Sequence, residues 1–329
     1  MDELTCVEIC AGAGGQSVGL EKAGFHHLVA LEIDPDACET LRLNRPDWHV
    51  VEMDVHHYDG LPLRGQVDLV AGGVPCPPFS IAGKQLGADD ERDLFPQALR
   101  LVEEIEPDAV MLENVRGLAT ARFAGYRQQI RDRLEELGYK TEWQVLNSSE
   151  YGVPQLRPRF ILVALRPEAH KHFEWPSPQG TPPTVGEVLG DAMAADGWPG
   201  AAAWTAKADG IAPTLVGGSR KHGGPDLGPT RAREGWARLG VNGKGLADEA
   251  PSAHDPVDLE PKLTVPMAAA IQGFDPDWKF FGRKTASYRQ VGNAFPPPVA
   301  EAVGKQIKAA LAAARAESAT SAAHLRLVG

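Results

Sequence analysis

The chain has 329 residues, of which 43% are hydrophobic and 23% are charged, and its formal net charge is −11. This composition is typical of a soluble globular protein with room for two domains, and the acidic balance argues against a simple nucleic-acid-binding protein. No apolar run approaches the length of a membrane span, and the four cysteines have no disulfide or zinc spacing, so we expect a cytoplasmic protein without a metal site.

The first predicted unit is a strand, a glycine-rich turn and a helix. Residues 4–9 are apolar enough for a buried strand, and the turn AGAGG at 11–15 follows directly. Ser17 is placed to cap a helix that runs to residue 23. Such a turn lets backbone N–H groups approach a ligand, although its spacing differs from the dinucleotide pattern G-x-G-x-x-G. The unit therefore predicts a ligand site at the end of the first strand.

Two acidic residues mark the ends of the next two predicted strands. A second strand is expected over 28–33, a helix over 35–44 and a third strand over 50–53. Glu32 lies near the end of the second strand, and Asp54 follows the third. An acid at such a position can accept hydrogen bonds from ribose hydroxyls, whereas each one alone can equally be a helix cap or a loop charge. With the glycine turn, they favour a nucleoside site.

Cys76 stands in a stiff turn after the fourth predicted strand. Residues 67–71 form a short apolar run, and GGVPCPPFS follows at 72–80. The flanking prolines fix φ and remove N–H donors, so the stretch is a turn and not a helix. A thiol at the carboxyl end of such a strand is placed as a nucleophile, although most free cysteines are small buried hydrophobic residues. The stretch alone leaves both interpretations open.

The next part of the chain carries a Glu-Asn pair and two arginines. After a loop over 81–93, helices are expected over 93–105 and 124–137, and strands over 109–112, 140–146 and 160–165. Glu113 and Asn114 follow the strand that ends at residue 112. Arg157 and Arg159 lie at positions i and i+2 of an extended segment, so they point the same way. They can bind a carboxylate or a phosphate, or simply line a surface.

The middle of the chain differs in composition from both ends. From about Trp175 to Leu263, Pro, Gly and Ala dominate and periodic patterning fades. Residues 205–245 hold seven Lys or Arg against three acids, which is consistent with a solvated loop or with DNA contact. Trp198, Trp204 and Trp236 favour a folded, loop-built binding region over a disordered insertion. A long Ala-rich helix is expected over 300–316, followed by a frayed tail over 318–329.

The motifs occur in an order and spacing that resemble the DNA (cytosine-5)-methyltransferases. They are the runs CAGAGG at 10–15, PC at 75–76, ENV at 113–115, QLRPR at 155–159 and QVGNA at 290–294. The resemblance covers nearly the whole chain except the middle section. It implies an α/β fold with a Rossmann-like, doubly wound sheet that binds S-adenosylmethionine, and a smaller, irregular target-recognition domain. The catalytic domain would span 1–176 and 284–329, and the recognition domain 177–283.

The same resemblance implies roles for individual residues. The expected catalytic residues are Cys76, which would bond covalently to C6 of cytosine, with Glu113, Arg157 and Arg159. The expected cofactor-binding residues are Cys10, Ala11, Gly12, Gly14, Gly15, Glu32, Ile33, Asp54, Val55, Pro75, Asn293 and Ala294. With the basic excess of the middle section, the expected DNA-binding residues are Ser80, Arg220, Lys221, Arg231 and Arg233. The chain departs from the family pattern at Cys10, where Phe is usual, and at Pro77, where Gln is usual.

The implied reaction is methyl transfer from S-adenosylmethionine to C5 of a flipped-out cytosine in a specific double-stranded DNA sequence, with S-adenosylhomocysteine as product. The implied setting is the bacterial cytoplasm, at the nucleoid, as a monomer that acts alone or beside a restriction endonuclease at the genetic level.

Three other functions stay open at this stage. Methylation of tRNA cytosine would use the same catalytic residues, although the long middle section favours DNA. A catalytically silent DNA-binding regulator is opposed by the presence of every expected catalytic residue. A nicotinamide-dependent oxidoreductase fits the glycine turn and Glu32, but it leaves the Pro-Cys pair, ENV and the two arginines unexplained.

Overall fold

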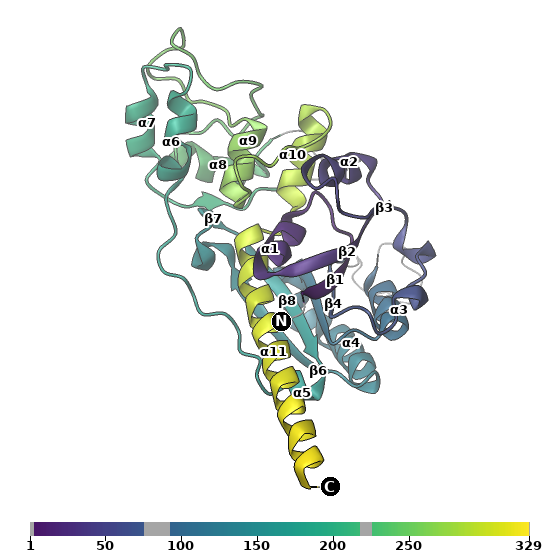
Figure 1. Cartoon of the computed structure of the whole chain (residues 1–329). Coiled ribbons are helices and arrows are strands. Elements are labelled where there is room, and N and C mark those ends of the chain that lie inside the picture. The colour runs from purple at the N-terminus through teal and green to yellow at the C-terminus, as the bar shows by residue number, and fades with distance from the viewer. Residues whose placement is uncertain (1–2, 76–92, 218–225, 329) are drawn as a thin grey trace.

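The computed structural model describes residues 3–75, 93–217 and 226–328 (Figure 1). Within them, seven strands form one sheet in the order β3-β2-β1-β4-β5-β8-β6. The strands are β1 (Leu4–Ile9), β2 (Phe25–Glu32), β3 (Val50–Glu52), β4 (Leu69–Gly73), β5 (Ala109–Val115), β6 (Lys140–Asn147) and β8 (Pro158–Leu165). β8 runs antiparallel to β5 and β6, and the other pairs are parallel. The strand order reverses between β1 and β4, where open α/β sheets bind ligands.

Helices cover both faces of the sheet, which confirms the predicted doubly wound fold. Successive residues of β5 separate the two sides, because Met111 packs with α1 (Gly15–Ala23) and α11 (Pro297–Val328), whereas Leu112 packs with α3 (Phe95–Ile105) and α4 (Ala124–Glu136). A strand buried on both faces has a continuous apolar sequence, as residues 109–112 do. In Figure 1, α11 runs along the sheet beside α1 and extends past the end of the strands.

Two local expectations were wrong. The first helix begins at Gly15 with Gly14 as its N-cap, and Ser17 lies fully buried inside the helix, where it caps nothing. The reason is that the turn ends at Gly14 in the left-handed region, φ +87°, directly before the first helical residue. The expected frayed tail is also helical, since α11 continues to Val328; the Ala-rich sequence has a high helix propensity.

The middle section contains more helix than its sequence predicts. Its elements are α6 (Val185–Ala194), α7 (Ala201–Lys207), α8 (Thr230–Arg238), α9 (Val265–Gln272) and the short strand β9 (Ala212–Pro213), which pairs with β7 (Gln155–Leu156). Trp198, Trp204 and Trp236 are buried, as expected of a folded region. Their cluster is continuous with residues of α1, α2 (Pro35–Asn44) and α10 (Lys284–Asn293), so the middle section shares a core with these helices. The proposed boundaries at 177 and 283 stay a prediction.

The remaining elements are short. They are α2 (Pro35–Asn44), α5 (Pro167–His170) and the 3₁₀ turns Val55–His57, Leu61–Leu63, Arg116–Ala119, Ala121–Phe123 and Ser148–Tyr151. In the part of the chain that the structure describes, no helix combines the length and apolarity needed to cross a bilayer. The same residues contain no group of three His, Cys, Asp or Glu side chains arranged to hold a metal ion.

Candidate active site

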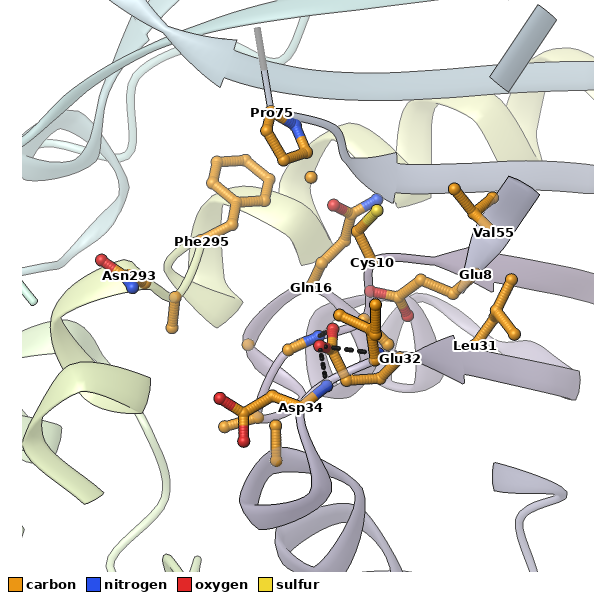
Figure 2. Close-up of a pocket in the computed structure, with 18 of the residues that line it drawn as sticks. Glu8, Cys10, Gln16, Leu31, Glu32, Asp34, Val55, Pro75, Asn293 and Phe295 are labelled. Atoms are coloured by element: carbon orange, nitrogen blue, oxygen red, sulfur yellow. Dashed lines mark hydrogen bonds between the residues drawn. The ribbon is translucent and has the colours of Figure 1, made fainter. Parts of the chain in front are cut away.

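A cavity of about 380 Å³ opens where β1, β2, β4 and β5 end, at the reversal of strand order (Figure 2). Its size is within the usual range for a small-molecule or cofactor site. Eleven of the twelve residues expected to bind a cofactor line it, which are Cys10, Ala11, Gly12, Gly15, Glu32, Ile33, Asp54, Val55, Pro75, Asn293 and Ala294. Glu113 also lines it, so residues separated by up to 284 positions in the sequence meet in one cavity.

Gly14 is the expected residue that does not line the cavity, and its neighbours explain why it is glycine. A Cβ on Gly14 would lie 2.7 Å from the Trp278 ring, and its φ of +87° disfavours any other residue. The Trp278 indole also donates a hydrogen bond to the carbonyl oxygen of Ala13, at 3.1 Å. On the other side of the turn, a Cβ on Gly15 would lie 2.3 Å from the Phe295 carbonyl oxygen. The glycine turn is therefore held between Trp278, which precedes α10, and Phe295, which follows it.

Glu32 is fixed at the end of β2 by the backbone. One carboxylate oxygen accepts the Gly12 N–H at 2.7 Å, and the other accepts the N–H groups of Ile33 at 2.9 Å and Asp34 at 2.8 Å (Figure 2). Burial raises the pKa of Glu32, while the three N–H donors oppose the shift. The carboxylate ties the glycine turn to the second strand and keeps lone pairs available for a ligand hydroxyl.

Asp54 lies at the rim of the same cavity and is supported by a histidine. Its Oδ1 accepts the His56 N–H at 3.0 Å and lies 2.7 Å from His56 Nδ1. These hydrogen bonds lower the pKa of Asp54 below its usual value. Nearby, the side chain of Ile33 is 62% exposed, an unusual exposure for a large apolar residue at the edge of a cavity. A flat apolar ligand group would cover it.

Cys10 occupies the position where the family pattern has Phe. Its φ of +51° places a non-glycine residue in the left-handed region, a conformation that costs free energy. Burial, followed by the negative charges of Glu32 and Asp54, raises the pKa of the Cys10 thiol well above its ordinary value. The direction of this shift favours the neutral thiol, which is a weaker nucleophile than the thiolate.

Glu113 and Arg159 form a close ion pair beside the cavity. Arg159 Nε lies 2.7 Å from Glu113 Oε1, and the side chains are only 11% and 12% exposed. Neighbouring β5 and β8 hold the two residues together. Burial raises the pKa of Glu113, with Arg159 and then Arg157 opposing the shift, and burial lowers the pKa of Arg159. Both pKa shifts favour the uncharged forms, as expected for charged groups that are removed from water. The raised pKa brings Glu113 closer to exchanging a proton near neutral pH.

Arg157 does not share the surroundings of Arg159, although it lies two residues away. Its side chain is fully buried, and its guanidinium donates to the carbonyl oxygens of Leu215 at 2.7 Å, Gly292 at 2.8 Å and Ala294 at 2.9 Å. Those carbonyls belong to the middle section and to the end of α10. Arg157 thus ties three segments together through their backbones, and its expected catalytic role stays a prediction.

The described part of the chain does not place every expected site residue at this cavity. Cys76, Ser80, Arg220 and Lys221 lie outside the described residues, although Pro75, directly before Cys76, lines the cavity. Arg231 and Arg233 lie on α8, away from the cavity wall. Arg231 is exposed, whereas Arg233 pairs with Asp226 at 3.1 Å.

Sequence reasoning missed some residues of the cavity wall, among them Glu8, Gln16, His56, Arg289 and Phe295. Two of these had a signal, because Arg289 and Phe295 directly flank the motif run QVGNA. Glu8 lies in the middle of an apolar strand and is buried, with its Oε2 3.0 Å from His27 Nε2. No pattern in the local sequence predicts this contact.

Comparison with known proteins identifies relatives over almost the whole chain. A family model described as C-5 cytosine-specific DNA methylase matches residues 4–309. The chain is 60% identical over 314 residues to the type II methyltransferase M.NaeI of Lentzea aerocolonigenes, covering 94% of this chain and 76% of that protein. It is 53% identical over 313 residues to the type II methyltransferase M.NgoMIV of Neisseria gonorrhoeae, covering 94% of this chain and 98% of that protein.

Solved structures share the fold at lower identity. An Escherichia coli prophage protein described as a DNA modification methyltransferase matches with a TM-score of 0.65 and 23% identity, over 94% of this chain and 99% of that one. A DNMT2 variant from Spodoptera frugiperda matches with a TM-score of 0.66 and 16% identity, over 93% of this chain and 99% of that one. At these identities the likeness concerns the fold alone.

Proposed function

The chain belongs to the family of C-5 cytosine-specific DNA methylases and is thus a DNA (cytosine-5)-methyltransferase. From this we propose the following substrate and mechanism. It methylates C5 of a cytosine that is flipped out of a specific duplex sequence, through a covalent bond between Cys76 and C6. S-adenosylmethionine is the methyl donor. Since the two relatives above are named type II methyltransferases, we infer that this chain protects DNA in a restriction-modification system, or acts without a partner endonuclease.

One observation carries the proposal: Pro75 and Glu113 line the same cavity as Glu32 and the glycine turn. Pro75 is the residue before Cys76, which supports the proposal that Cys76 acts at this cavity. Glu113, on β5, is the proposed proton donor. A methyl donor held by Glu32 would therefore lie beside the groups that activate the base.

The residues of the cavity fit S-adenosylmethionine. Glu32 is placed to accept from the ribose hydroxyls, Asp54 from the adenine amine, and the exposed face of Ile33 is free to pack on the adenine ring. Asn293 supplies amide groups at the far wall. When bound, the cofactor supplies an electrophilic methyl group on a sulfonium.

The chemistry requires a nucleophile because C5 of cytosine is electron-poor. Addition of the Cys76 thiolate to C6 turns C5 into an enamine carbon that can accept a methyl group. Glu113, whose pKa is raised by burial, donates a proton at N3 as the negative charge develops there. Arg159 holds the cytosine O2 and keeps Glu113 in place, while Arg157 supports the backbone around them. A base then removes the C5 proton, and Cys76 leaves.

Cytosine cannot reach this cavity from within a stacked duplex, so the base must flip out of the helix. This costs roughly a few kcal/mol. Segment 177–283 is proposed to choose the sequence, because the catalytic motifs lie outside it. The exposed Arg231 is available for a phosphate, whereas Arg233 must first leave Asp226.

Methylation mapping of DNA from cells that express the protein tests the function. We expect 5-methylcytosine at one short duplex sequence, and none when Cys76→Ser is expressed at the same level. With DNA that contains 5-fluorocytosine at the mapped position, wild type should form a covalent adduct resistant to denaturant, and Cys76→Ser should not.

Three outcomes would contradict the proposal. An adduct in the Ser variant would show that Cys76 is not the nucleophile. Methylation of tRNA in place of duplex DNA would favour the alternative substrate. DNA binding without methylation by wild type would favour the silent regulator.

A further inference from the structure

Arg289 carries a charge opposite to that of the wall around it. Five carboxylates line the cavity, on Glu8, Glu32, Asp34, Asp54 and Glu113. Among the lining residues that the structure describes, Arg289 alone is a lysine or arginine. The wall therefore favours a cationic group of a ligand in most places, and an anionic group is best placed beside Arg289.

The side chain of Arg289 is positioned to meet such a group. Arg289 and Asn293 lie four residues apart on α10, so they share one face of the helix, and both line the cavity. Arg289 Nη2 lies 3.4 Å from Asp34 Oδ2, with the two side chains 18% and 22% exposed. This distance is longer than the roughly 2.7–2.9 Å of a strong charged hydrogen bond. A guanidinium also has five N–H donors. Asp34 thus orients Arg289 without using all of its donors.

The helix that carries Arg289 is fixed to the rest of the site. Gln290 accepts a hydrogen bond from the Thr40 hydroxyl at 2.6 Å and donates one to the Phe281 carbonyl oxygen at 2.8 Å, which ties α10 to α2. The following residues, through Phe295, pack against Gly15 of the glycine turn. Arg289 therefore faces the cavity from a rigid wall, which limits the entropy lost when it binds a ligand.

We propose that Arg289 binds the carboxylate of the methionine part of S-adenosylmethionine. The inference rests on the proposed cofactor and assigns one of its groups. The ammonium and the sulfonium of that molecule are compatible with the acidic wall, but its carboxylate needs a cation. Arg289 supplies it, and so selects a nucleoside that carries an amino-acid carboxylate over one that lacks it.

Calorimetric titration of the DNA-free protein tests this with two ligands that differ in one group, S-adenosylmethionine and decarboxylated S-adenosylmethionine. We expect Arg289→Gln to weaken binding of the first by about 10- to 100-fold, as for a lost hydrogen-bonded charge, and to change binding of the second by less than about twofold. Arg289→Lys, which keeps the charge, should recover part of the loss. Arg283→Gln is the matched control, because Arg283 is exposed just before α10 and outside the cavity wall.

Equal losses for both ligands would overturn the inference, since Arg289 would then act only through the structure of the wall. Unchanged binding of S-adenosylmethionine by Arg289→Gln would overturn it as well. In both of these cases wild type still binds S-adenosylmethionine, so the proposed cofactor stands. If wild type binds neither ligand, the proposed cofactor is wrong, and the assignment of Arg289 is wrong with it.

Discussion

Glu32 is buried and Glu113 is largely buried, both near the carboxyl ends of strands, yet the two carboxylates are held in different ways. Both oxygens of Glu32 accept backbone N–H groups, three in all. Glu113 is held through one oxygen by the side chain of Arg159. Backbone donors are fixed by the fold, whereas a side-chain partner can move when a substrate arrives. The contrast fits the roles proposed above, in which Glu32 is a fixed acceptor and Glu113 is a proton donor.

The largest expected effect is that of Glu113→Gln on catalysis. A glutamine amide can still accept from Arg159, but it cannot pass a proton to N3, so the rate of methyl transfer should fall by about 10²- to 10⁴-fold. Binding of S-adenosylmethionine should stay near wild type. Single-turnover transfer of a labelled methyl group to duplex DNA measures the rate. If the rate falls by less than about tenfold, Glu113 does not transfer the proton, and the proposed contrast in role between Glu113 and Glu32 is not supported.

Glu32→Gln should act on binding and on stability. Its amide NH₂ cannot accept, so at least one backbone N–H of the glycine turn or of Ile33 and Asp34 loses its partner. We expect the free energy of unfolding to drop by about 1–3 kcal/mol and S-adenosylmethionine binding to weaken by roughly 10- to 100-fold. Urea unfolding and calorimetry measure the two effects.

Glu52→Gln on β3 is the matched control, because Glu52 is an exposed acid on the neighbouring strand. If Glu32→Gln behaves like this control in both measurements, the three backbone hydrogen bonds do not hold the site.

The smallest effect concerns stability against pH. The pKa of Glu113 is raised in the folded protein, so its favourable contribution is present below the ordinary pKa, about 4.3, and is lost as pH rises through the folded value. Glu113→Gln mimics the protonated form at every pH. We expect the variant to be more stable than wild type at pH 8, by about 1.4 kcal/mol per unit of pKa shift, and the difference to vanish near pH 4.

Urea unfolding of the ligand-free protein between pH 4 and pH 8 checks the sign. The opposite result is a variant that is less stable than wild type at pH 8, with a difference in stability that shrinks as pH falls. It would mean that the attraction of Arg159 outweighs the effect of burial on the pKa of Glu113. The pKa of Glu32 is raised as well, so its pH dependence has the same direction, and the loss of stability expected for Glu32→Gln comes from the backbone N–H groups that lose a partner.

Much of the cavity is predictable from the sequence because its residues lie at strand ends. Glu32, Asp54 and Glu113 each follow an apolar run, and the carboxyl ends of parallel strands share one edge of a sheet. What holds each residue is not predictable in this way. The three carbonyls that accept from Arg157 lie 58 to 137 positions away, and the need for glycine at position 14 comes from Trp278. These are tertiary contacts, which leave no local pattern.

The helices of the middle section were missed for a related reason. α7 and α8 are short, with 7 and 9 residues, and bury few side chains each, so they give little periodic signal. Similarly, the distinction between Arg157 and Arg159 does not follow from their i and i+2 spacing. Arg157 lies in the gap between β7 and β8, where the regular alternation of strand side chains does not apply.

The path of α11 brings the helix close to the start of the first strand. Arg315 on this helix pairs with Asp68, and Asp68 accepts the backbone N–H of Thr5 at 2.6 Å, so the last helix passes beside the start of the first strand. Joining residue 316 to residue 4 by a short linker and opening the chain before residue 284 would give a circular permutant. In it, the two parts of the proposed catalytic domain would be continuous, and the proposed recognition segment 177–283 would lie at the carboxyl end while keeping the core that it shares with α10.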